Sequence, residues 1–163
     1  MKCMLSATVA VLLAACSAHA ASAQPKAPSQ IEFKVAARYQ TSVILLVPAE
    51  ATETDLTKLI GALRTARATG SFIRLFPPTT PNGSYGPYAG VELFVISDPN
   101  WATVPRLQSF MNPKTGGISA TEREFWSRVL AHYFYTSIAK QEIGTIGFED
   151  EGHQYTAKYK KQF

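Results

Sequence analysis

The chain has 163 residues, of which 46% are apolar and 17% charged, and its formal net charge is +4. This length suits one domain with an ordinary hydrophobic core, and the 11% aromatic content excludes a wholly disordered chain. Only two cysteines are present, Cys3 and Cys16, so a disulfide-rich scaffold is excluded as well.

The first residues have the pattern of a secretory signal peptide. Lys2 provides a positive start, and the run from Met4 to Ala15 is apolar. Those 12 residues would rise only about 18 Å as a helix, too little to cross a hydrocarbon core of about 30 Å. We therefore expect residues 1–15 to direct export and to be removed. No later segment is apolar for long enough to predict a transmembrane helix.

Residues 13–16 (LAAC) resemble the lipobox of bacterial lipoproteins at all four positions. The resemblance implies that Cys16 is lipidated and that its acyl chains anchor the protein in a membrane. Ser17 stands where an inner-membrane retention signal would have Asp, which implies the outer membrane, with the domain facing the periplasm. The alternative is ordinary signal cleavage near Ala20 or Ala23, which would release a soluble periplasmic or secreted protein.

The segment after the lipobox indicates a tether followed by a folded domain. Residues 16–30 comprise Cys16 and a stretch rich in Ala, Ser, Pro and Gln without apolar periodicity. From residue 31 the pattern changes, because apolar and polar side chains alternate over residues 31–35 as in a half-buried strand. Residues 43–47 (VILLV) indicate a more central strand, and the polar residues between the two permit an antiparallel hairpin. The single domain is expected over residues 31–163.

The middle of the chain predicts one clear helix and two strands. Thr52 and Asp55 are spaced as a capping box, and an apolar stripe follows over a helix at residues 52–68. Residues 71–76 and 91–97 both have strand character and both end at prolines.

The last third predicts two further helices and a hairpin. A short helix is expected from Thr103 to about Met111. A longer helix is expected over residues 119–141, opened by a capping box of Ser119 and Glu122. Strands over 143–148 and 155–160 then form a terminal hairpin. The predicted fold is α+β, an antiparallel sheet of about six strands with two or three helices packed on one face.

The 14 residues 77–90 form an unusually long loop containing four prolines and three glycines. Its large side chains are Tyr85 and Tyr88, and Trp101 follows the next predicted strand. Flat aromatic groups on a rigid loop commonly contact sugars or extended peptides. We therefore regard Tyr85, Tyr88 and Trp101 as candidate ligand or partner contacts.

Sequence motifs for catalysis, metals and cofactors are absent. No nucleophile elbow, paired histidine spacing or phosphate-binding glycine loop occurs, and no catalytic residue, metal ligand or cofactor is assigned. His132 falls within the predicted long helix, while Glu92 and Glu142 are isolated in sequence. The lysines at 158, 160 and 161, interleaved with tyrosines, fit a solvated strand or an anionic surface.

These patterns together indicate a lipid-anchored envelope protein that works as a binding or accessory module through its Pro/Gly-rich loop. Its expected partners are the membrane, through the anchor, and an envelope protein, peptide or glycan; nucleic acid does not fit an exported chain. Two alternatives are a periplasmic hydrolase or transferase with a site around His132, and an immunity-type protein that binds an envelope partner.

Lipidation of Cys16 can be tested on the membrane fraction by mass spectrometry. The expected mature N-terminus is an acylated Cys16, because the lipobox directly follows the apolar run. An unmodified N-terminus at Ala21 or Gln24 would show ordinary signal cleavage and contradict the anchor.

Overall fold

The computed structural model describes residues 32–80, 84–112, 119–150 and 152–163. The predicted signal peptide (residues 1–15), Cys16 and the tether to residue 30 lie outside the described residues. Within the described ranges no helix has the length and apolar character needed to cross a bilayer.

The core of the fold is a sheet that has six strands in the described part of the chain. Their order across the sheet is β1 (Lys34–Tyr39), β2 (Ser42–Leu46), β3 (Gly90–Ile96), β4 (Ala131–Thr136), β5 (Gln141–Ile146) and β8 (Lys160–Lys161). All neighbours are antiparallel except β2 and β3, which are parallel. A parallel pair needs a crossover connection, and α1 (Glu53–Ala68) provides it. The predicted α+β class with about six strands is confirmed, and the β2–β3 pair makes the sheet mixed.

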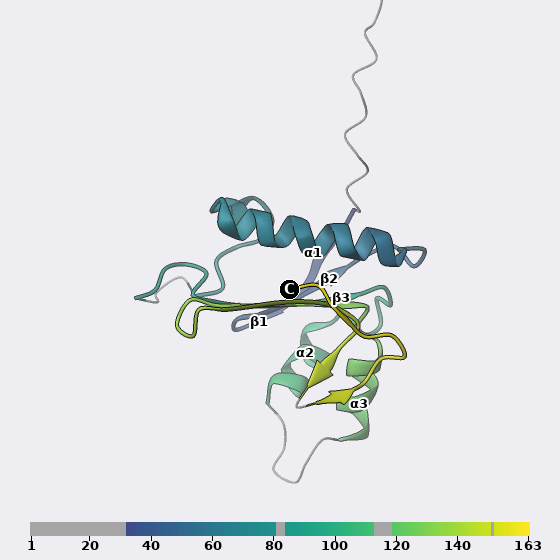
Figure 1. The fold of residues 1–163 in the computed structure, drawn as a ribbon. Helices are drawn as coiled ribbons and strands as arrows, with labels where there is room; N and C mark the ends of the chain where they lie inside the picture. Colours follow the sequence, from purple (N-terminus) through teal and green to yellow (C-terminus); the bar gives the residue numbers. More distant parts are fainter. Residues whose placement is uncertain (1–31, 81–83, 113–118, 151) are drawn as a thin grey trace, which may run out of the picture.

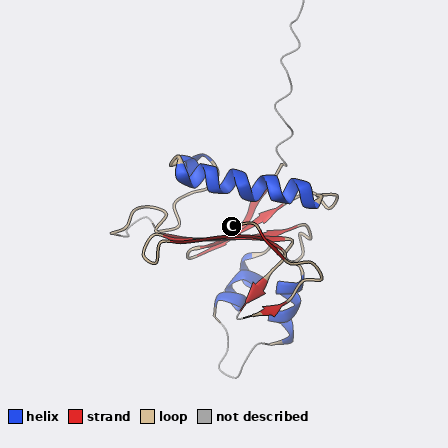
Figure 2. Cartoon of the chain, in the orientation of Figure 1, coloured by secondary structure: helices blue, strands red, loops and turns tan. Residues whose placement is uncertain are grey.

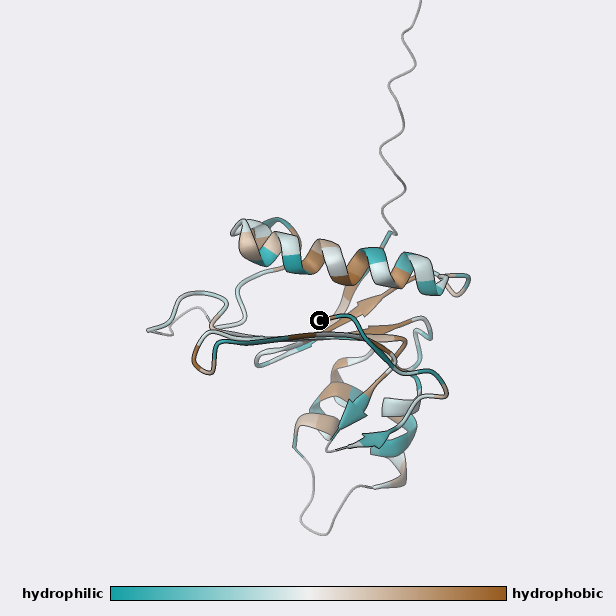
Figure 3. Ribbon diagram, in the orientation of Figure 1, coloured by the Kyte–Doolittle hydropathy of each residue, from teal (hydrophilic) through white to brown (hydrophobic). Residues whose placement is uncertain are grey.

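Helices cover both faces of the sheet, a difference from the expected packing on one face. Helix α1 lies on one face, and α2 (Val104–Met111) and α3 (Ala120–Ser127) lie on the other (Figures 1 and 2). The reason is visible in β2, where Val43 and Leu45 join the core under α1 while Ile44 joins the core with α2 and α3. A strand that is apolar at consecutive positions must be buried on both sides. Figure 3 shows the resulting hydrophobic strands between two helical layers.

Both predicted capping boxes are present. The Thr52 hydroxyl accepts a hydrogen bond from the Asp55 amide at 3.2 Å, and the Asp55 carboxylate accepts one from the Thr52 amide at 3.1 Å. Ser119 and Glu122 make the equivalent reciprocal bonds at the start of α3. Helix α2 also lies where the sequence predicts it.

The predicted long helix over 119–141 is wrong beyond Ser127. Helix α3 ends there, and β4 and β5 follow as an antiparallel hairpin. Residues 131–136 are mostly apolar or aromatic, so they satisfy a helical and a strand pattern equally well. In the sheet, Tyr133 is buried under α1, whereas His132 stacks on Phe94 at the other face. The turn between the strands contains Lys140 at φ 51°, a conformation that ends any helix.

Two other predicted strands are also corrected. Residues 71–76 are not a strand: Gly70 adopts φ 68°, and a 3-10 helix (Ser71–Arg74) follows. Phe72 within this helix and Phe76 just after it are both buried. The predicted strand over 155–160 is reduced to β8, which pairs with β5. The strands β6 (Glu149–Asp150) and β7 (His153–Gln154) have two residues each and form a separate hairpin. This hairpin lies between β5 and β8, where the sequence predicted only a turn.

Two glycines give a matched test of the packing of α1 against the sheet. Gly61 is on the exposed side of α1, where an added Cβ would meet nothing within 4 Å. Gly144 on β5 faces both α1 and the C-terminal residue, because its Cβ would lie 2.4 Å from Cζ of Phe163 and 2.5 Å from Cγ2 of Ile60. We expect Gly61→Ala to raise the free energy of unfolding by about 0.5–1 kcal/mol and Gly144→Ala to lower it by about 1–3 kcal/mol. Urea denaturation measures both, and effects of the same sign would contradict this packing.

Candidate functional site

Three segments gather at one end of the sheet, which we call the loop end. They are the C-terminal end of α1 with the 3-10 helix, residues 84–89 before β3, and the β4–β5 turn at residues 137–140 (Figure 1, left). The Ser137 amide donates to the Ala89 carbonyl at 2.8 Å, which joins the second and third segments. The loop end is therefore a surface assembled from parts of the chain that are distant in sequence.

A small pocket of about 180 Å³ opens at the loop end. Its lining residues are Arg67, Gly70, Phe72, Tyr85, Pro87, Tyr88 and Tyr135. Pockets that enclose a whole drug-sized ligand usually measure about 300–1,000 Å³. This pocket is therefore suited to one ring or one side chain of a larger ligand.

The two predicted loop tyrosines line this pocket in different roles. Tyr85 is 65% exposed, so its ring is free to contact a ligand. Tyr88 is half-buried: its hydroxyl donates to the Phe76 carbonyl at 2.6 Å, and its ring meets Phe72 edge to face at 5.4 Å. Burial raises the pKa of the Tyr88 hydroxyl. Tyr88 thus supports the pocket wall, while Tyr85 is the accessible ring.

Trp101, the third predicted contact, is not brought to the loop end. Tyr88 precedes β3 and Trp101 follows it, so the strand separates them by about 20 Å. Trp101 is only 8% exposed and belongs to the core that α2 and α3 cover. The Arg106 guanidinium lies 4.3 Å from its ring centroid. The structure therefore gives Trp101 a packing role on the other side of the molecule.

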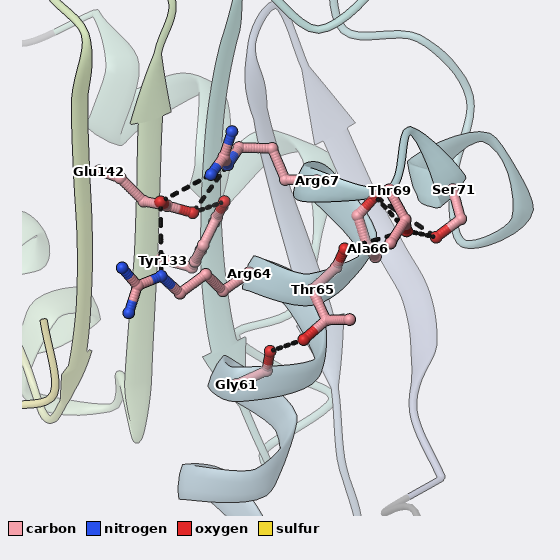
Figure 4. A network of polar contacts seen from close by, with 9 residues as sticks. All are labelled: Gly61, Arg64, Thr65, Ala66, Arg67, Thr69, Ser71, Tyr133 and Glu142. Carbon is pink, nitrogen blue, oxygen red and sulfur yellow. Dashed lines mark hydrogen bonds and ion pairs between the residues drawn. The ribbon is translucent and has the colours of Figure 1, made fainter.

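A polar network beside the pocket ties α1 to the sheet (Figure 4). Arg67 donates two hydrogen bonds to the Glu142 carboxylate, at 2.9 and 3.0 Å, and the Tyr133 hydroxyl donates a third at 2.7 Å. Arg64 Nε lies 3.6 Å from the same carboxylate. The Arg67 guanidinium also lies 4.8 Å from the Tyr135 ring centroid. Sequence reasoning missed this network, and the only local signal was two arginines one turn apart on a predicted helix.

The network changes the ionisation of its members. Burial alone would raise the pKa of Glu142, but hydrogen bonds from Arg67 and Tyr133 and the two arginine charges outweigh burial, so its pKa is lowered. The hydrogen bond to Glu142 raises the pKa of Arg67, and burial raises that of Tyr133. Glu142 therefore stays ionised and holds Arg67 in place, and the paired bonds use two of its five N–H groups.

The alternative site around His132 lies on the opposite face of the sheet. Its Nε2 is 3.4 Å from Oε1 of Glu92, and the buried Ser42 hydroxyl donates to the other oxygen of Glu92 at 2.9 Å. In a serine triad the imidazole lies between the hydroxyl and the carboxylate, so that it can take the hydroxyl proton. Here the carboxylate is in the middle, and His132 does not activate Ser42. His153 is exposed on β7.

Within the described ranges no group of three or more His, Cys, Asp or Glu side chains is placed to hold a metal ion.

Comparisons with known proteins add no assignment. No protein-family model matches this chain, and neither a curated protein nor a solved structure matches it.

The Glu142 network gives a stability prediction with a defined pH dependence. Because the folded pKa of Glu142 is lowered, its stabilisation is complete above its unfolded pKa of about 4.3 and is lost as the pH falls through the folded value. We expect Glu142→Gln to cost about 1–2 kcal/mol of unfolding free energy at pH 7, and the difference from wild type to shrink below about pH 4.

The matched control is Glu124→Gln, which removes an exposed ion pair to Arg128. It should cost at most about 0.5 kcal/mol at any pH. Urea denaturation measures the loss of unfolding free energy in both variants. Equal losses at pH 7 would contradict the larger contribution expected of Glu142.

Proposed function

We propose that this protein is exported, anchored in the outer membrane through lipid on Cys16, and binds a protein partner in the envelope through the loop end of its sheet. The lipobox at residues 13–16 supports the anchor. The observation that supports the binding role is the pocket that Tyr85 and Arg67 both line. Tyrosine and arginine are enriched among the residues that contribute most to binding at protein interfaces.

The segment that carries Tyr85 is held by hydrogen bonds. Thr80 donates its amide to the Pro87 carbonyl at 2.9 Å and its hydroxyl to the Gly86 carbonyl at 3.0 Å. The Ala89 amide in turn donates to the Thr80 hydroxyl at 2.8 Å. A surface that is ordered before binding loses less conformational entropy when a partner docks. Because these hydrogen bonds order the segment before binding, Tyr85 can contact a partner with little loss of conformational entropy.

The composition of the loop end favours a peptide segment or protein over a glycan. Besides Tyr85, two aliphatic side chains are largely exposed at this end: Ile73 at 60% and Ile138 at 67%. Ile73 lies in the 3-10 helix and Ile138 in the β4–β5 turn, so each of these loop-end segments presents an exposed apolar side chain. The pocket size then fits one side chain of the partner. An immunity-type protein would be one case of this class, since it also neutralises its target by binding.

Site-specific photocrosslinking in native envelopes tests this proposal. A photoreactive phenylalanine derivative in place of Tyr85 should give one dominant crosslinked product, because that position lies inside the proposed interface. Val104 is the matched control, since it is an exposed apolar residue, 39% accessible, at the start of α2 on the other face. The same substitution there should give no such product.

A binding measurement with the captured partner completes the test. Tyr85→Ala should weaken binding by about tenfold or more, as for a typical interface anchor, while Val104→Ala changes it less than about twofold. Crosslinks from position 104 but not from position 85 would place the interface on the α2 side and contradict the proposal.

A further inference from the structure

A second and larger pocket lies at the end of the sheet opposite the loop end. Its volume is about 340 Å³, within the range of small-molecule sites. It is lined by the N-terminal turn of α1, the connection from α3 to β4, the end of β5 and the segment before β8. The lining residues are Glu53, Leu56, Ser127, Val129, Leu130, Ile146, Gly147, Thr156, Ala157 and Lys158.

The floor of this pocket is aliphatic. Leu56, Val129 and Ile146 belong to the hydrophobic cores and are at most 5% exposed, and Leu130 is partly buried against the core under α1. Among the described residues, the charged members of the lining are Glu53 and Lys158, which are both exposed. The lining thus joins four aliphatic side chains, of which little surface is exposed, to Glu53 and Lys158, the exposed charged residues that we call its rim.

One wall is fixed by a close approach of two backbones. Gly147 adopts φ 75°, and an added Cβ there would lie 1.9 Å from the Lys158 carbonyl oxygen. The Thr156 hydroxyl donates to that same carbonyl at 2.8 Å and accepts from the Phe148 amide at 3.0 Å. The segment carrying Thr156, Ala157 and Lys158 is therefore held against the end of β5, and the pocket is a built feature of the fold.

The rim of the pocket carries net positive charge. Lys158 lines it, and Lys160 reaches Glu53 with Nζ 3.7 Å from Oε1. Two lysines against one carboxylate leave one positive charge beside an aliphatic floor. This combination matches a molecule with one anionic group and one hydrocarbon chain, and the volume has room for a single chain.

We propose that this pocket binds a free fatty acid, with the hydrocarbon chain on the aliphatic floor and the carboxylate beside Lys158. Burial of the chain provides most of the affinity, since each buried methylene contributes about 0.8 kcal/mol. The lysine selects an anionic head over a neutral one. This site is separate from the loop end and does not depend on the function proposed for that surface.

Titration calorimetry with a series of fatty acids tests the proposal. The full-length chain carries Cys16→Ser, because an acyl chain on Cys16 could itself compete for the pocket. Affinity for octanoate, decanoate and dodecanoate should rise about fourfold per added methylene and then level off once the pocket is full. Dodecanol, which has the same chain without the charge, should bind at least about fivefold more weakly than dodecanoate. Absence of binding, or equal affinity for the alcohol and the acid, would overturn the proposal.

Three variants locate the site. Ala157→Trp places a large ring in the pocket from an exposed position and should reduce dodecanoate affinity more than tenfold, with the circular dichroism spectrum unchanged. Lys158→Glu should reduce it about fivefold. Lys161→Glu makes the same charge change outside the pocket lining and should alter affinity less than twofold. Equal losses for the two lysine variants would mean that bulk charge, not this pocket, attracts the acid.

Discussion

The carboxylate of Glu142 is the contact on which the arrangement of the loop end depends. It accepts hydrogen bonds from Arg67 on α1 and from Tyr133 on β4. Since Glu142 is on β5, its side chain connects α1 to both β4 and β5. Burial of a lone carboxylate there would be unfavourable, and the hydrogen bonds from Arg67 and Tyr133, together with the arginine charges, outweigh that effect. Because Arg67 also lines the pocket, the contact that holds α1 against the sheet fixes one wall of the proposed binding site.

The second constraint is burial of the central strands on both faces. β2 and β3 have buried side chains at consecutive positions, and such strands require a helical layer above and below. Helix α1 provides one layer as the crossover between the parallel strands, and α2 with α3 provides the other. With both faces covered, the loop-end pocket and the pocket beside Lys158 open at the two ends of the sheet, where loops leave the layers.

The elements that were predicted correctly from the sequence are those whose sequence patterns extend over only a few neighbouring residues. Helix α1 has a capping box and an apolar stripe, and both are local. Residues 131–136 could not be assigned in this way, since a mostly apolar and aromatic run fits a helix or a doubly buried strand, and only pairing with β3 and β5 decides between them.

The candidate site shows the same limit. Tyr85 and Tyr88 were predictable because a long loop with prolines and glycines is unusual in a small domain. Arg67 and Glu142 are 75 positions apart, and nothing in either neighbourhood indicates the other. Trp101 was grouped with the tyrosines by residue type alone, and the length of β3 separates them.

The proposed binding role of the loop end is tested most directly by amide hydrogen exchange on the protein in native envelope membranes, compared with the purified chain. We predict slower exchange in the membranes at residues 84–89 and 137–140, with no change over α2. Slower exchange over α2 and α3 with an unchanged loop end would contradict it.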